Sequence, residues 1–172
     1  YATVEHTHIQ AQILGIPHIL ETCSVADPVK EADIVKKVVK KNPVDAVILG
    51  GTGLQVTQIK SVQDALLPLG VEVFASHAGL DHVDLLRDMV KKGYKIMVSQ
   101  FMTEGLDKEW LGKVLDEQSV EELIKTARFY GFHEGGDGSA YETFVLNSPF
   151  FSKEITFDAL EFISDAPYSG YV

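Results

Sequence analysis

The sequence predicts an α/β fold: a doubly wound parallel sheet with helices on both faces, followed by a small α+β lobe. Short β-branched runs alternate with segments of helical spacing through the first hundred residues. The run at 46–49 is apolar throughout, as in parallel strands that are covered on both faces. The alternation stops after Phe101. We therefore expect one domain at residues 1–102 and a second at residues 103–172.

Four apolar runs predict strands in the first domain, at 16–20, 44–49, 71–75 and 94–101. The segments before the later three repeat apolar residues every three or four positions, as amphipathic helices do. Glycine or proline stands near the helix ends, where the chain must turn toward the next strand. Because a doubly wound fold normally begins with a strand and this chain opens on helical spacing, we expect at least one strand upstream of Tyr1.

The second domain has a different composition. Residues 103–112 are rich in turn formers, and the apolar spacing over 120–130 predicts a helix. Four glycines follow between 131 and 138, and apolar runs predict strands at 141–146 and 154–157. This order predicts a lobe of one helix and two strands.

Charge and composition exclude several classes of protein. Twenty-five acidic residues against fifteen Lys and Arg give a net charge of −10, which repels nucleic-acid backbones. No apolar run reaches the roughly 20 residues that cross a bilayer, and the N-terminal residues lack signal-peptide features. We therefore expect a cytoplasmic protein that contacts neither nucleic acid nor membrane. The six histidines show no metal-binding spacing, so no metal site is predicted.

A glycine turn forms the first candidate site. Gly50, Gly51 and Thr52 follow the strand at 44–49 directly and precede a predicted helix. Ligands of α/β sheets bind beyond the carboxyl ends of strands, and a helix N-terminus favours an anion. A dinucleotide-binding fingerprint needs a further glycine and a later acidic residue, and both are missing here. A nucleotide or anion contact, a structural turn and, with least support, a NAD-type site remain open.

A glycine-rich loop forms the second candidate site. Residues 133–138 lead into the apolar strand that starts at Tyr141, and they are followed by further acidic positions. Carboxylates such as Asp137 and Glu142 orient cationic groups, transfer protons or bind Mg²⁺. The alternative is a glycine-rich turn before a hairpin, with solvated acidic side chains.

Two segments resemble motifs of the diphthine–ammonia ligase family. Residues 105–116, GLDKEWLGKVLD, are similar to the family's GLDxxWLGR.LD, and residues 136–151, GDGSAYETFVLNSPFF, are similar to GEGGE[FY]ET.VLD.P.F. Residues 10–17 and 93–98 add supporting matches, so the similarity covers nearly the whole chain. The resemblance implies a Rossmann-like domain of the adenine nucleotide α-hydrolase type and a family-specific C-terminal lobe.

The resemblance also implies a reaction. Family members amidate the carboxylate of diphthine on elongation factor 2, using ATP and ammonia. ATP first converts the carboxylate into an acyl-adenylate, and ammonia then displaces AMP. The cofactors implied are ATP and Mg²⁺, and the partners are ammonia and a protein carboxylate. The protein's main tasks would be to neutralise the polyphosphate and to exclude water.

The resemblance assigns roles to particular residues. Gly50, Gly51 and Thr52 are expected on the nucleotide side. The acids Glu142 and Asp137 are the candidate catalytic residues, and Glu142 is preferred because it keeps both its identity and its motif position. The expected substrate-binding residues are Gln58, Gly136, Gly138, Tyr141 and Thr143.

Several positions depart from the family pattern. The family's phosphate-binding loop is not found between residues 1 and 172, and we expect it upstream of Tyr1. Ile59 and Ser61 replace two arginines that clamp anions, while Ala140 and Asn147 replace two acids. Two hypotheses follow: a divergent but active amide ligase, or a noncatalytic relative that binds or assembles with a partner.

Overall fold

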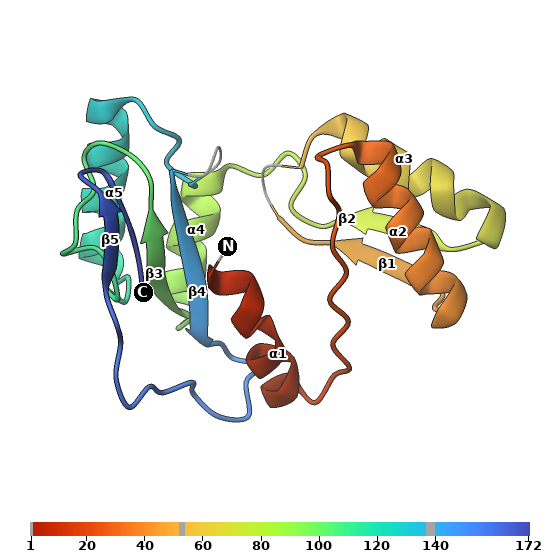
Figure 1. Ribbon diagram of the computed structural model, residues 1–172, viewed down its shortest axis with the longest axis horizontal. Helices are drawn as coiled ribbons and strands as arrows, with labels where there is room; N and C mark the ends of the chain where they lie inside the picture. Colours follow the sequence, from red (N-terminus) through yellow and green to blue (C-terminus); the bar gives the residue numbers. More distant parts are fainter. Residues whose placement is uncertain (1, 52–53, 137–139) are drawn as a thin grey trace. The chain divides into compact units, whose positions relative to one another are not determined.

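The computed structural model describes residues 2–51, 54–136 and 140–172, and it divides the chain into two compact units (Figure 1). One unit is formed by residues up to 18 together with 81–172, and the other by residues 19–80. The fold is mixed α/β, with one small parallel sheet and one antiparallel sheet. The expected continuous parallel sheet is not found in the described part of the chain.

The unit of residues 19–80 contains a parallel two-stranded sheet and two packed helices. Its elements are α2 (Pro28–Lys41), β1 (Ala46–Leu49), α3 (Val56–Leu66), a 3₁₀ turn (Leu67–Leu69) and β2 (Glu72–Ala75). β1 and β2 are parallel, with Leu49 opposite Ala75. Ala32, Val39, Val62 and Leu66 of the two helices are buried together. The predicted strand–helix–strand order of this segment is confirmed.

The strand expected at 16–20 is absent. These residues have no regular secondary structure, and Ile16, Ile19 and Leu20 are all at least half exposed. Pro17 has no N–H to donate to a neighbouring strand. An apolar run alone does not make a strand, because the strand also needs a partner to pair with.

The other unit is built around a four-stranded antiparallel sheet. Its strands are β3 (Lys95–Phe101), β4 (Tyr141–Asn147), β5 (Ile163–Ala166) and β6 (Ser169–Tyr171), in the order β4-β3-β6-β5. β3 was expected in the parallel sheet of the first domain, but it pairs antiparallel with β4. Both parallel and antiparallel sheets contain continuous apolar strands when both faces are covered. The apolar pattern of β3 therefore did not distinguish the two kinds of pairing. The predicted division at residue 102 therefore falls between two paired strands.

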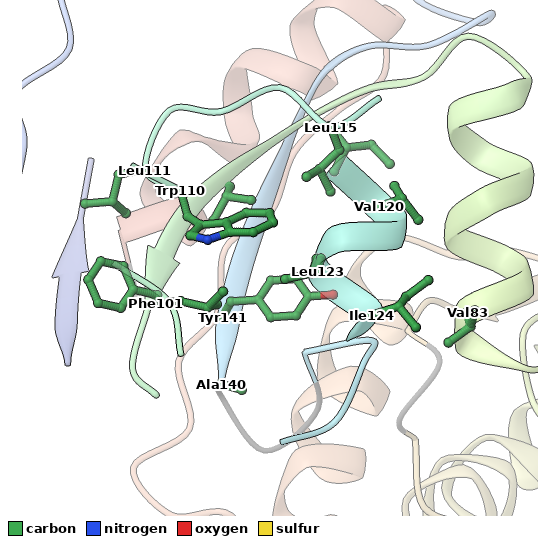
Figure 2. Packing of buried hydrophobic residues seen from close by; sticks show 13 residues of the cluster. Val83, Phe101, Trp110, Leu111, Leu115, Val120, Leu123, Ile124, Ala140 and Tyr141 are labelled. Carbon is green, nitrogen blue, oxygen red and sulfur yellow. The ribbon is translucent and has the colours of Figure 1, made fainter. Parts of the chain in front are cut away.

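Helices cover both faces of this sheet. α4 (His82–Lys91) and α5 (Glu117–Tyr130) contribute Val83, Leu123 and Ile124 to a core on one face. Figure 2 shows the Tyr141 ring beneath the Trp110 indole, pointing toward α5. α1 (Ala2–Leu14) lies on the other face. The core on that face consists of Ile13 of α1 together with Met97, Phe144, Leu146 and Ile155.

The C-terminal region corrects two expectations. The strand expected at 154–157 is not formed; Ile155 is buried, and its N–H donates to the Leu146 carbonyl at 2.8 Å. The strands β5 and β6 were not predicted, because they are short and carry no clear alternation. Val172 continues from β6 and donates its N–H to the Ser99 carbonyl at 2.9 Å. The C-terminus is thereby attached to the central strand of the sheet.

Helix α5 begins at Glu117, three residues before the apolar spacing alone would place its start, and Asp116 is its N-cap. The Asp116 Oδ1 accepts from the Ser119 hydroxyl at 2.6 Å and from the Ser119 N–H at 2.7 Å. In return, the Asp116 N–H donates to the Ser119 hydroxyl at 2.8 Å. This reciprocal cap satisfies backbone groups that the helix leaves open.

The cap makes stability depend on pH in the acid range. The hydrogen bonds from the Ser119 hydroxyl and then the Ser119 N–H lower the pKa of Asp116. A carboxyl with a lower pKa in the folded state stabilises the fold above its unfolded pKa, and this contribution is lost as pH falls through the folded pKa. We expect Asp116→Asn to flatten the fall in stability below about pH 4, measured by urea unfolding. Parallel curves for the two proteins would contradict this.

Candidate functional site

The glycine turn lies where the two parallel strands end. Because Leu49 and Ala75 stand opposite each other, residues 50–51 and the turn at 76–79 share one edge of the sheet. Gly51 has a φ of 100°, which other residues rarely adopt, and an added Cβ would make only an ordinary 3.8 Å contact with Leu54. The backbone conformation, rather than lack of space, therefore requires glycine at 51. Thr52 lies outside the described residues.

Gln58 has a structural partner. Its side-chain Oε1 accepts a hydrogen bond from the Gln55 N–H at 2.9 Å, at the start of α3. The side chain is half-buried and caps the helix. Capping of α3 accounts for glutamine at this position, and the substrate role expected for it stays a prediction.

Residues 133–136 of the glycine-rich loop lie against the start of β4. The Tyr141 hydroxyl donates to the Glu134 carbonyl at 2.6 Å, and the Tyr141 side chain is buried. Gly136 has a φ of 80°, and a Cβ there would lie 2.8 Å from the Tyr141 carbonyl oxygen. The loop therefore needs glycine at 136 both for its conformation and for its contact with Tyr141. Asp137 and Gly138 lie outside the described residues.

Glu134, in the same loop, carries a perturbed carboxyl group. A hydrogen bond from its own backbone N–H, and then the Arg128 guanidinium, lower the pKa of Glu134. The Arg128 Nε donates to the Glu134 carboxylate at 3.1 Å. The ion pair holds this carboxylate charged beside the loop, and it fastens the end of α5 to the loop.

β4 separates the expected site residues. Side chains alternate between the faces of a strand, so Glu142 lies on the face of Phe144 while Tyr141 and Thr143 lie on the face of the α4–α5 core. Glu142 is half-buried and stands opposite Gln100 of β3. Of the acids favoured by the sequence, Glu142 is the one whose position is described. It faces the α1 side of the sheet, away from the Tyr141 hydroxyl.

The sequence reading missed two features near these residues. The rings of His82 and His133 lie 4.7 Å apart between centroids, although 51 positions separate them. Ser99 sits at an irregularity of β3 opposite the step from Glu142 to Thr143, and it is buried. No local spacing signals either feature, because each depends on the pairing of distant segments.

The expected site residues are divided between the two units. Gly50, Gly51 and Gln58 belong to the unit of residues 19–80. The residues of the loop and of β4, Gly136, Tyr141, Glu142 and Thr143, belong to the other unit. Each set is therefore positioned by a core of its own.

The described residues include no group of three or more His, Cys, Asp or Glu side chains that could hold a metal ion. None of their helices combines the length and the apolar character that a bilayer span requires.

A family model matches the part of the chain that carries the glycine-rich loop and β4. The family described as diphthamide synthase C-terminal domain matches residues 81–167, about half of the chain. The chain is also 30% identical to a zebrafish protein (Danio rerio) named diphthine–ammonia ligase, over 94% of the chain and 69% of that protein. The chain belongs to the diphthine–ammonia ligase family. The family resemblance inferred from the sequence is thereby confirmed.

Mammalian relatives give the same result. The chain is 31% identical to the human diphthine–ammonia ligase over 76% of its length, and 32% identical to the mouse protein over 75%. These matches cover 49% of the human and 48% of the mouse protein, so the chain spans about half the length of these relatives. The family match begins at Asp81, the residue where the chain returns to the sheet unit.

Proposed function

We propose that this chain forms the acid-bearing part of an ATP-dependent amide ligase that acts on diphthine of elongation factor 2. The observation that carries the proposal is the family match over residues 81–167, which includes Glu142 on β4. The relatives are named for diphthine and ammonia, the two substrates that the reaction joins. We place the activity in the cytoplasm, with no nucleic-acid or membrane contact.

The proposed chemistry has two steps. A carboxylate oxygen of diphthine attacks the α-phosphorus of ATP, and pyrophosphate leaves. The nitrogen of ammonia then attacks the acyl carbon, the bond to the AMP oxygen breaks, and the nitrogen loses a proton. Mg²⁺ would accompany the triphosphate, because it is usually held by phosphates and water with few protein ligands. The absence of a three-ligand cluster in the described residues fits this mode of binding.

The glycine turn is suited to the nucleotide side. It lies at the carboxyl edge of the parallel pair, where α/β sheets bind ligands, and it leads to the N-terminus of α3. Gly50 is exposed, and no atom of the described residues lies within 4 Å of an added Cβ there, so the backbone is open to a ligand. We assign Gly50, Gly51 and Thr52 to contacts with the nucleotide.

Glu142 is the proposed acid for ammonia. A half-buried carboxylate attracts the ammonium ion and accepts a proton as the neutral nucleophile forms. Asp137 is the second proposed acid, with Gly136, Gly138, Tyr141, Thr143 and Gln58 on the substrate side. Because Tyr141 donates its hydroxyl to the Glu134 carbonyl, its proposed role is to hold the loop in place.

We expect Glu142→Gln to lower turnover at least about tenfold, because the amide removes the charge and the proton acceptor that the step requires. AMP release by the full-length protein, with ATP, ammonium and diphthine-bearing elongation factor 2, measures this. The control is Glu117→Gln, which removes an exposed carboxylate in the first turn of α5. Wild-type turnover in Glu142→Gln, with an unchanged melting temperature, would remove Glu142 from the mechanism.

A noncatalytic binding role is the second candidate, and one set of observations favours it. The fold itself accounts for three motif residues: Gln58 caps α3, Gly136 avoids a clash, and Tyr141 bonds to a backbone carbonyl. Residues that the fold requires can be retained in a protein that has lost its catalytic activity. Calorimetric titration of the full-length protein with Mg²⁺ and ATP separates the candidates. No heat at millimolar ATP would favour the noncatalytic role.

A further inference from the structure

One face of the antiparallel sheet forms the floor of a cavity of about 400 Å³. Met97 of β3, Phe144 of β4 and Tyr171 of β6 lie on this floor, while α1 and the segment 157–161 contribute the walls. All of these residues belong to one unit of the chain. The volume falls in the range of cavities that hold small organic ligands, which are mostly apolar with a few placed polar groups.

Ser99 supplies an unused hydroxyl on the floor. The residue is only 3% exposed and lines the cavity, and its Oγ has no hydrogen-bond partner among the described residues. Buried hydroxyl groups nearly always have a partner, because an unpartnered one loses its hydration without compensation. A ligand with a hydroxyl or carbonyl group would supply the missing partner.

The titratable side chains among the described residues of the cavity include two carboxylates and the His6 imidazole. Glu5 of α1 and Glu161 line it, and no Lys or Arg does so among the described residues. Aromatic rings also line it, including Phe144 and Tyr171. Carboxylates and aromatic ring faces both attract organic cations, so the lining favours an ammonium ion and disfavours an anion.

We propose that this cavity binds a small organic amine. Its ammonium group pairs with Glu5 and Glu161, its apolar body packs on Phe144 and Tyr171, and a hydroxyl or carbonyl at its other end meets Ser99. The proposal does not depend on the ligase activity, because it concerns binding in the absence of ATP and uses residues outside the glycine turn and loop.

Tyramine, which carries an ammonium group, an aromatic body and a hydroxyl, is the probe. The chain has three methionines, of which Met97 lines the cavity while Met89 packs in the opposite core and Met102 is exposed. In the full-length protein with ¹³C-methyl methionine, tyramine up to about 10 mM should shift the Met97 signal and leave the Met89 and Met102 signals in place. The titration is run at about pH 8.

Two analogues and two variants test the individual contacts. 4-(2-Hydroxyethyl)phenol lacks the ammonium group and should bind at least about threefold more weakly than tyramine, a difference that Glu161→Gln should reduce. 2-Phenylethylamine lacks the ring hydroxyl and should also bind more weakly, and Ser99→Ala should abolish that difference. Ser99→Ala should keep the melting temperature, because it removes a hydroxyl that has no partner.

Several experimental outcomes would contradict the proposed amine site. It is overturned if the Met97 signal stays in place, if only Met89 or Met102 shifts, or if the neutral analogue binds as tightly as tyramine. Unchanged discrimination between tyramine and 2-phenylethylamine in folded Ser99→Ala would likewise overturn it. Loss of ligase activity in another experiment would leave this result unaffected.

Discussion

Phe101→Ala is expected to lower the free energy of unfolding by about 3–5 kcal/mol. Phe101 is the last residue of β3, is 2% exposed and belongs to the core cluster that also contains Trp110, Leu111 and Tyr141 (Figure 2). Truncation removes the buried ring and leaves a cavity, because the paired strands around it cannot collapse to fill the space. Urea unfolding, followed by the fluorescence of Trp110 in the same core, measures the change.

Phe129→Ala is the matched control for this substitution. It removes the same side chain from the same unit, but the Phe129 ring is 82% exposed on α5. Its cost should stay within about 0.5 kcal/mol, as for most surface substitutions. Equal losses of stability in the two variants would show that the core is not where the structure places it.

Gly136→Ala is expected to destabilise the glycine-rich loop and its contact with β4. An alanine at a φ of 80° costs about 1–2 kcal/mol by itself. The added Cβ would also lie 2.8 Å from the Tyr141 carbonyl oxygen, a backbone atom of a paired strand that cannot move away cheaply. We expect this overlap to add about 1–3 kcal/mol, which urea unfolding measures.

Gly131→Ala separates the two causes. Gly131 ends α5 with a φ of 77°, and no atom of the residues that the structure describes lies within 4 Å of an added Cβ there. This control therefore carries the conformational cost without the overlap. If Gly136→Ala is no more destabilising than Gly131→Ala, the loop is not packed on Tyr141 and its proposed positioning of the substrate side loses its basis.

The sequence predicted the local elements well. The helices α2, α3, α4 and α5 and the strands β1 to β4 follow from apolar spacing, and several of their ends follow from glycine and proline. The periodicity of a segment is a property of that segment alone. Local patterns therefore predicted the secondary structure of a segment wherever its pairing with distant segments did not determine it.

Sheet membership could not be predicted in the same way. β3 is apolar on both faces, a pattern that fits a parallel strand and also a covered antiparallel one, and only its pairing with β4 distinguishes them. The run at 16–20 has strand-forming residues but no partner. Pairing joins segments that are far apart in the chain, so no local window contains the information.

The candidate site residues were chosen from the family resemblance more than from the chemical properties of the residues themselves. The motifs at 105–116 and 136–151 led to the family that the comparisons confirm. The roles of individual residues were harder to foresee. Tyr141 and Glu142 are neighbours in the motif but face opposite sides of β4, and the Ser99 cavity arises from α1, the sheet and the C-terminal segment together.

We propose that the protein makes an amide from a carboxylate by way of an acyl-adenylate. The most direct measurement supplies the full-length protein with ATP, ¹⁵N-ammonium and diphthine-bearing elongation factor 2, and follows nucleotide products and ¹⁵N incorporation together. The account predicts AMP and pyrophosphate in equal amounts with one ¹⁵N-labelled amide. Formation of ADP and phosphate, or AMP release without ¹⁵N in the acceptor protein, would contradict it.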